Sequence, residues 1–139
     1  MTGVQTCALP ILVSGVGRII NADNTWYSYE NKYSTESTTT LQIPAQIPAE
    51  TAEKVQENAL KIYQVTECSG MARVDSMLRE SDGEVIFNEL NALPGFTNIS
   101  MYPKLFEEAG ISYPDLITRL IRLAEERYAH KKTLLHKHD

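Results

Sequence analysis

A helical period of apolar residues runs from Ala49 to Thr66. Apolar residues recur there every three or four positions on one stripe, and the charged residues lie largely outside it. The stripe consists of Ala52, Val55, Ala59, Ile62 and Tyr63. The pattern predicts an amphipathic helix whose stripe packs into a core rather than forming a site.

Two more helices are predicted near the C-terminus. The first runs from Pro103 to Ala109 and ends at Gly110, a residue type that favours helix ends. Ser112 and Asp115 have the spacing of a capping box, which predicts a final helix. The residues expected to pack inward from that helix are Leu116, Leu120, Ile121, Leu123 and Ala124. Residues 129–139 form a basic tail, which we expect to fray.

Segments rich in β-branched or alternating apolar residues predict strands. Val13 to Ile20 runs into a turn-forming stretch, and Thr40 to Ile43 is a second β-prone segment that ends at a proline. Met71 to Leu78 and Glu84 to Leu90 flank a turn that contains Asp82-Gly83. This last arrangement predicts a β-hairpin.

Composition and charge narrow the class of protein. The 139 residues are 42% hydrophobic, which allows one domain with a modest core. The net charge of -5, with acidic and basic residues interspersed, provides neither the basic stripe of nucleic-acid-binding proteins nor a polybasic run for lipid. We therefore expect small-molecule partners, no nucleic acid and no membrane.

The two cysteines, Cys7 and Cys68, are too few for a disulfide framework, and their spacing matches no metal site. The apolar run from Cys7 to Val13 lacks a preceding basic region and is far too short to cross a bilayer. These features predict a cytoplasmic protein.

The first residues of the chain, MTGVQTCALPI, match an in-frame translation of a common sequencing adapter. We therefore predict that Met1 to Ile11 (residues 1–11) are an adapter artefact and that the natural sequence begins near Leu12. The alternative is a genuine first strand, because Val4 to Val13 has the apolar residues and the proline of an edge strand.

Four polar residues of the predicted hairpin have spacings that suit a binding site. Arg73 and Asp75 are two apart on one strand, and Glu89 and Asn91 are two apart on the next, so each pair shares a face of its strand. If the faces coincide, Asp75, Glu89 and Asn91 present the hard oxygen ligands that suit magnesium, and Arg73 adds an anion-binding fork. By spacing alone, the pattern is also that of an ordinary hairpin with charged residues on its solvent-exposed face.

The turn decides whether the two faces of the hairpin coincide. A two-residue loop at Asp82-Gly83 would set Asp75 opposite Leu90, whereas a three-residue loop that also includes Ser81 would set Asp75 opposite Glu89. We therefore predict the loop of odd length.

The string ARVD at residues 72–75, followed by NELNALPGFTNISMYPKLF at residues 88–106, resembles D-alanine:D-alanine ligases of the ATP-grasp superfamily. The likeness runs from about Val13 to Tyr128 and corresponds to the C-terminal part of a family member. It implies an α+β fold, with a mostly antiparallel sheet and flanking helices, and assigns residues 12–128 to the C-terminal part of the ATP-grasp domain.

The resemblance assigns roles to the hairpin and to the segment that follows it. The metal ligands of the family match Asp75, Glu89 and Asn91, which implies two Mg²⁺ or Mn²⁺ ions beside ATP. Its oxyanion-stabilising groups match Arg73 and the backbone N–H of Gly95.

The same resemblance places the carboxylate of the acceptor D-alanine on Ser100 and the Met101 backbone. It also matches Tyr27 to Tyr33 to a loop that closes over the active site, with Lys32 on the transferred phosphate and Tyr33 in a hydrogen-bonded group. Taken alone, a lysine between aromatic residues is an ordinary solvated surface residue.

The implied reaction starts when ATP phosphorylates the carboxylate of one D-alanine. The amine of a second D-alanine then attacks, phosphate leaves, and the dipeptide enters peptidoglycan synthesis. No Gly-rich phosphate loop occurs in this chain. We therefore expect no ligase activity from the chain alone, and a homodimer for the full-length enzyme.

Three alternatives remain on the sequence alone. The acceptor could be D-serine or D-lactate, and Tyr33 argues mildly against lactate. Another ATP-grasp carboxylate-amine ligase would share the metal hairpin, but the segment from Leu93 to Ser100 speaks against it. The third alternative is an inert fragment that binds without chemistry.

Overall fold

Five strands form one antiparallel sheet in the computed structural model, which describes residues 1–10, 12–21, 39–79 and 81–135. The order across the sheet is β3-β2-β1-β4-β5. The strands are β1 (Thr2–Leu9), β2 (Leu12–Asn21), β3 (Thr39–Gln42), β4 (Ala72–Leu78) and β5 (Val85–Asn91). The helices are α1 (Ala49–Val65), α2 (Met101–Glu108) and α3 (Tyr113–Leu135). The predicted α+β class is confirmed.

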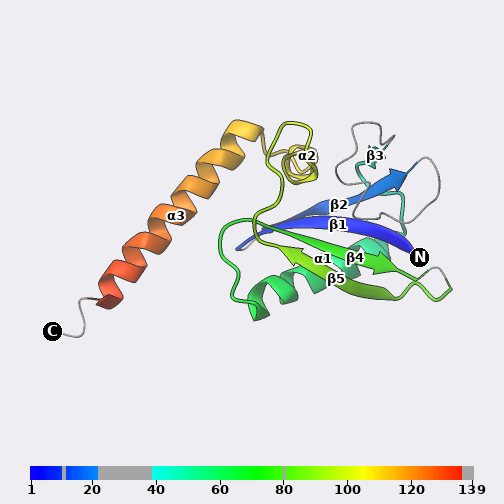
Figure 1. Ribbon diagram of the computed structural model, residues 1–139, viewed down its shortest axis with the longest axis horizontal. Helices are drawn as coiled ribbons and strands as arrows, with labels where there is room; N and C mark the ends of the chain where they lie inside the picture. The colour runs from blue at the N-terminus through cyan, green and yellow to red at the C-terminus, as the bar shows by residue number, and fades with distance from the viewer. Residues whose placement is uncertain (11, 22–38, 80, 136–139) are drawn as a thin grey trace.

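The two faces of the sheet are covered by different helices (Figure 1). On one face, α1 buries Val55, Ala59 and Tyr63 of its predicted stripe. On the other face, α2 packs Tyr102 and Phe106 into the larger core. Burial of both faces explains why the strands contain so many apolar residues.

The central strand β1 divides its side chains between these two cores. Val4 joins the core beneath α1, and Cys7 and Leu9 join the core beneath α2. Because side chains alternate along a strand, Gln5 lies on the same face as Cys7. Residues 1–11, predicted to be encoded by an adapter, thus include the strand between β2 and β4.

The hairpin of β4 and β5 has the predicted register but not the predicted turn. An even number of residues lies between the paired Leu78 and Val85, so the expected odd-length loop is wrong. Continued without interruption, the pairing of Leu78 with Val85 would set Asp75 opposite Asn88 and send Glu89 to the other face. A β-bulge corrects the register, because Asn88 is the extra residue between the Ser76–Phe87 and Asp75–Glu89 pairs.

Helix α3 begins with the predicted capping box and then extends away from the sheet (Figure 1). Leu116 is buried, but Ile121 is 54% exposed, so the expected inward packing of Ile121 and Ala124 is wrong. The helix continues to Leu135, where fraying was expected from residue 129. Only the first turns of α3 contact α2, so the apolar residues further along α3 have no core to pack against. In the described part of the chain, no helix has the length and apolarity needed to cross a membrane.

The segment between β5 and α2 is anchored by aromatic contacts. The ring of Phe96 lies 5.7 Å from that of Tyr102 and 5.4 Å from that of Tyr113, between centroids. The Tyr113 hydroxyl donates a 2.9 Å hydrogen bond to the Phe96 carbonyl. The two helices that follow, α2 and α3, therefore hold this segment in place.

Helix α2 approaches β2 closely at Gly17. A Cβ atom at this position would lie 2.7 Å from Met101 Sδ and 3.2 Å from Leu105 Cδ2. Gly15 on the same strand has no such neighbour within 4 Å. The small residue at position 17 therefore sets how near the start of α2 lies to the sheet.

We predict that Gly17→Ala lowers the free energy of unfolding by roughly 1–3 kcal/mol, because Met101 and Leu105 must shift. Urea titration followed by circular dichroism measures the loss. Gly15→Ala is the matched control and should lower the free energy of unfolding by a smaller amount. Equal losses for the two variants would show that strand propensity, not the approach of α2, limits this position.

We also predict that Tyr113→Phe, which removes one hydroxyl and keeps the ring, costs about 0.5–1.5 kcal/mol of unfolding free energy. Amide hydrogen exchange should accelerate between residues 93 and 100. Tyr128→Phe alters a tyrosine on the same helix that is 70% exposed, and it should change neither quantity. Unchanged exchange in Tyr113→Phe would contradict the anchoring role of the hydroxyl.

Candidate functional site

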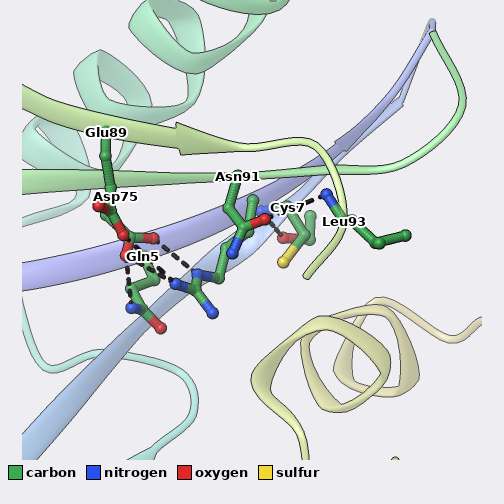
Figure 2. Close-up of polar contacts among 8 residues, drawn as sticks. Gln5, Cys7, Asp75, Glu89, Asn91 and Leu93 are labelled. Carbon is green, nitrogen blue, oxygen red and sulfur yellow. Dashed lines mark hydrogen bonds and ion pairs between the residues drawn. The ribbon is translucent and has the colours of Figure 1, made fainter. Parts of the chain in front are cut away.

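The hairpin brings the four predicted polar residues onto one face of the sheet. Arg73 pairs with Asn91, and Asp75 pairs with Glu89 across β4 and β5. Figure 2 shows Asp75 and Glu89 lying beside one another, with Asn91 further along the same strand as Glu89. Paired residues of antiparallel strands share a face, so all four lie on the α2 side of the sheet.

Arg73 and Asp75 form a bidentate ion pair within β4. Arg73 Nε–H donates to Asp75 Oδ1 at 2.8 Å, and a terminal N–H of the guanidinium donates to Oδ2 at 2.9 Å. The two side chains are only 17% and 12% exposed. A terminal nitrogen of Arg73 also lies 3.8 Å from Glu89 Oε1. This geometry is the strong, fork-like form of an arginine-carboxylate contact.

Gln5 adds a contact that the sequence did not reveal. Its Nε2–H donates to Asp75 Oδ2 at 2.9 Å, across 70 residues of sequence (Figure 2). Among the described residues, no hydrogen-bond partner reaches the buried Gln5 Oε1. The position of β1 beside β4 creates this contact, and no local sequence signal could have predicted it.

The environment shifts the ionisation of both members of the ion pair. Burial raises the pKa of the Asp75 carboxyl, and the Arg73 guanidinium offsets only part of that rise. Burial also acts to lower the pKa of Arg73, but hydrogen bonds and attraction to Asp75 outweigh it and raise the pKa. Arg73 therefore stays charged at neutral pH and supplies the counter-charge that an ionised Asp75 needs.

The donor set on this face fits a hard divalent cation. Asp75 and Glu89 supply carboxylate oxygens and Asn91 supplies an amide oxygen, which are ligand types that Mg²⁺ and Mn²⁺ accept. Within the described ranges, no three His, Cys, Asp or Glu side chains are grouped so that they could hold a metal ion, so the amide is needed to complete three ligands. Asn91 Oδ1 also accepts the Leu93 N–H at 3.0 Å.

The segment after Asn91 places Gly95 against Ser100. A Cβ atom at Gly95 would lie 3.1 Å from Ser100 Oγ, so a larger residue would press on that hydroxyl. Ser100 Oγ accepts the Thr97 N–H at 3.0 Å and lies 2.8 Å from Thr97 Oγ1. Two predicted acceptor-side residues are therefore direct neighbours.

Ser100 is the N-cap residue of α2, and Met101 is the first residue of that helix. The Met101 side chain is buried in the core, so only its backbone is suited to contact a ligand. A helix N-terminus carries partial positive charge and favours an anion. The predicted Lys32 and Tyr33 lie outside the described residues.

A profile of the family described as D-ala D-ala ligase C-terminus matches residues 7–122. A D-alanine–D-alanine ligase of Lactobacillus delbrueckii subsp. bulgaricus is 91% identical over 142 residues, which cover 99% of this chain and 39% of that protein. This chain thus spans well under half of its relative.

Two solved structures share the fold. The VanG D-Ala:D-Ser ligase of Enterococcus faecalis is 34% identical with a TM-score of 0.74, over 88% of this chain and 36% of that one. The D-alanine–D-alanine ligase of Bacillus anthracis complexed with ATP is 27% identical with a TM-score of 0.76, over 94% of this chain and 40% of that one. The resemblance drawn from the hairpin motif is confirmed, and the chain belongs to the D-alanine–D-alanine ligase C-terminus family.

Proposed function

We propose that this chain provides the metal-binding and acceptor-binding part of an ATP-dependent ligase that joins two D-alanines. The observation that carries the proposal is the register of β4 and β5, which gathers Arg73, Asp75, Glu89 and Asn91 on one face of a family member. The Bacillus anthracis relative, whose structure is a complex with ATP, supports ATP as the phosphoryl donor.

In the proposed site, Asp75, Glu89 and Asn91 hold two Mg²⁺ or Mn²⁺ ions. Such ions neutralise phosphate charge during phosphoryl transfer and so lower the barrier. The bulge at Asn88 supports this assignment, because it turns Glu89 toward Asp75. Bulges commonly re-aim side chains next to active sites.

The acceptor side uses groups that favour negative charge. Arg73 and the Gly95 N–H stabilise the oxyanion that forms when the amine of the second D-alanine attacks the acyl phosphate. Ser100 Oγ and the Met101 N–H bind the carboxylate of that D-alanine. The contact between Gly95 and Ser100 supports one continuous acceptor site.

Lys32 and Tyr33 complete the proposed site. Lys32 contacts the transferred phosphate, and Tyr33 joins a hydrogen-bonded group of the closed loop. Closure keeps water from the acyl phosphate. The full-length enzyme acts in the cytoplasm as a homodimer, with D-alanine and ATP as its substrates.

A D-alanine:D-serine ligase is the second candidate. The similarity to the Enterococcus faecalis D-Ala:D-Ser ligase supports it, because that protein shares both fold and 34% of aligned residues. The 91% identical relative that is named for D-alanine supports the first candidate. Competition between D-alanine and D-serine as acceptors discriminates the two.

We also propose that residues 1–11 are encoded by a sequencing adapter rather than by the gene. The buried Gln5 Oε1 has no hydrogen-bond partner among the described residues, and such an acceptor lowers stability by about 1–3 kcal/mol. This unfavourable arrangement supports an origin outside the gene. Sequencing the source DNA upstream of the Leu12 codon tests it, because an uninterrupted gene that encodes MTGVQTCALPI would overturn it.

We predict that Glu89→Gln weakens Mn²⁺ binding by at least about tenfold, because the variant loses a charged ligand. Isothermal titration calorimetry with Mn²⁺ measures this. Asp82→Asn removes one acidic charge from the exposed turn and should leave the affinity unchanged. Equal affinities for Glu89→Gln and the wild type would remove Glu89 from the metal site.

We predict that the chain alone releases no phosphate from ATP with D-alanine. Residues 12–139 joined to the N-terminal part of the Lactobacillus delbrueckii relative should form D-alanyl-D-alanine, detected by mass spectrometry. Ser100→Ala in this fusion should raise the KM for the acceptor more than it lowers kcat. Turnover by the isolated chain would contradict the proposed division of the enzyme.

A further inference from the structure

Arg73 and Asp75 satisfy one another in the structure. Both oxygens of Asp75 accept an N–H from the guanidinium, and Gln5 donates a further hydrogen bond to Oδ2. The carboxylate occupies the edge of the guanidinium formed by Nε and one terminal nitrogen, one of the two edges that can bind an oxyanion in two places. In this arrangement the proposed metal ligand and the proposed anion ligand neutralise each other's charge.

Burial makes the separation of this pair costly for either partner alone. A buried charge that loses its counter-charge is strongly destabilised, whereas an exposed one is rehydrated. A cation that binds Asp75 alone draws the carboxylate's charge away from Arg73, and an oxyanion that binds Arg73 alone draws the guanidinium's charge away from Asp75. When a cation and an oxyanion bind together, Asp75 pairs with the cation and Arg73 pairs with the oxyanion. Neither buried charge is then left without a counter-charge.

We propose that the Arg73–Asp75 pair makes this site selective for a divalent cation and an oxyanion bound together, and against either ion alone. This inference rests on the proposed function, which places the cation on Asp75. The selectivity prevents free phosphate from occupying the site without metal.

The test uses the 139-residue chain with Mn²⁺ and inorganic phosphate as probes, each alone and both together, by isothermal titration calorimetry. Arg73→Lys keeps the positive charge but lacks the fork, so Mn²⁺ alone should bind about tenfold more tightly than to the wild type. Asp75→Asn releases the guanidinium, so phosphate alone should bind about tenfold more tightly.

Glu89→Gln is the matched control for charge in the phosphate titration. It removes one negative charge 3.8 Å from Arg73 but leaves the bidentate pair intact. It should raise phosphate affinity by about twofold only, as expected for an exposed and screened charge. Solution association of Mn²⁺ with phosphate is the same for every variant, so differences among variants come from the protein.

The inference requires both increases in affinity, that of Arg73→Lys for Mn²⁺ and that of Asp75→Asn for phosphate. Wild-type affinity for Mn²⁺ in Arg73→Lys, or equal phosphate affinity in Asp75→Asn and Glu89→Gln, would overturn the inference and leave the proposed function standing. Absence of Mn²⁺ binding in the wild type and in Arg73→Lys would overturn both.

A second measurement uses only the wild-type protein and so does not depend on how the variants fold. The ¹⁵N resonance of Arg73 Nε should keep its position with phosphate alone and move when Mg²⁺ and phosphate are added together. Movement with phosphate alone would show that the guanidinium is not held by Asp75.

Discussion

The pairing of β4 with β5 is the constraint on which the candidate site depends. Side chains in a strand alternate with a period of two, so a shift of one residue would send Glu89 and Asn91 to the face beneath α1. The bulge at Asn88 supplies that shift and compensates for the even length of the turn. One unpaired residue thus decides whether carboxylates meet across the two strands.

Burial on the α2 face then determines how these groups behave. The sheet covers Arg73 and Asp75 from one side, and β1 contributes Gln5 next to them. Weak screening by water strengthens the contact between guanidinium and carboxylate and makes each group dependent on the other. The exposed pair of Arg79 and Asp82 in the turn has no such dependence, because water hydrates both charges.

The acceptor side is positioned by packing rather than by charge. Phe96 lies against Tyr102 and Tyr113, so the backbone between Gly95 and Ser100 is fixed from α2 and from the start of α3. Gly17 lets α2 approach β2 closely enough to bring Ser100 and Met101 to this position. The metal side and the acceptor side are linked through the bond from the Leu93 N–H to Asn91.

The sequence by itself determined the elements whose signals are local. The helical period of Ala49–Val65, the capping box at Ser112 and the location of the hairpin are local signals, although the length of the hairpin turn was not predicted correctly. The motif from Arg73 to Met101 identified the family. Only the tertiary structure decided the bulge at Asn88, the contact of Gln5 with Asp75 and the exposure of Ile121 on α3. Each of these depends on which distant segment lies alongside, because pairing register and burial are properties of two surfaces in contact and not of either segment alone.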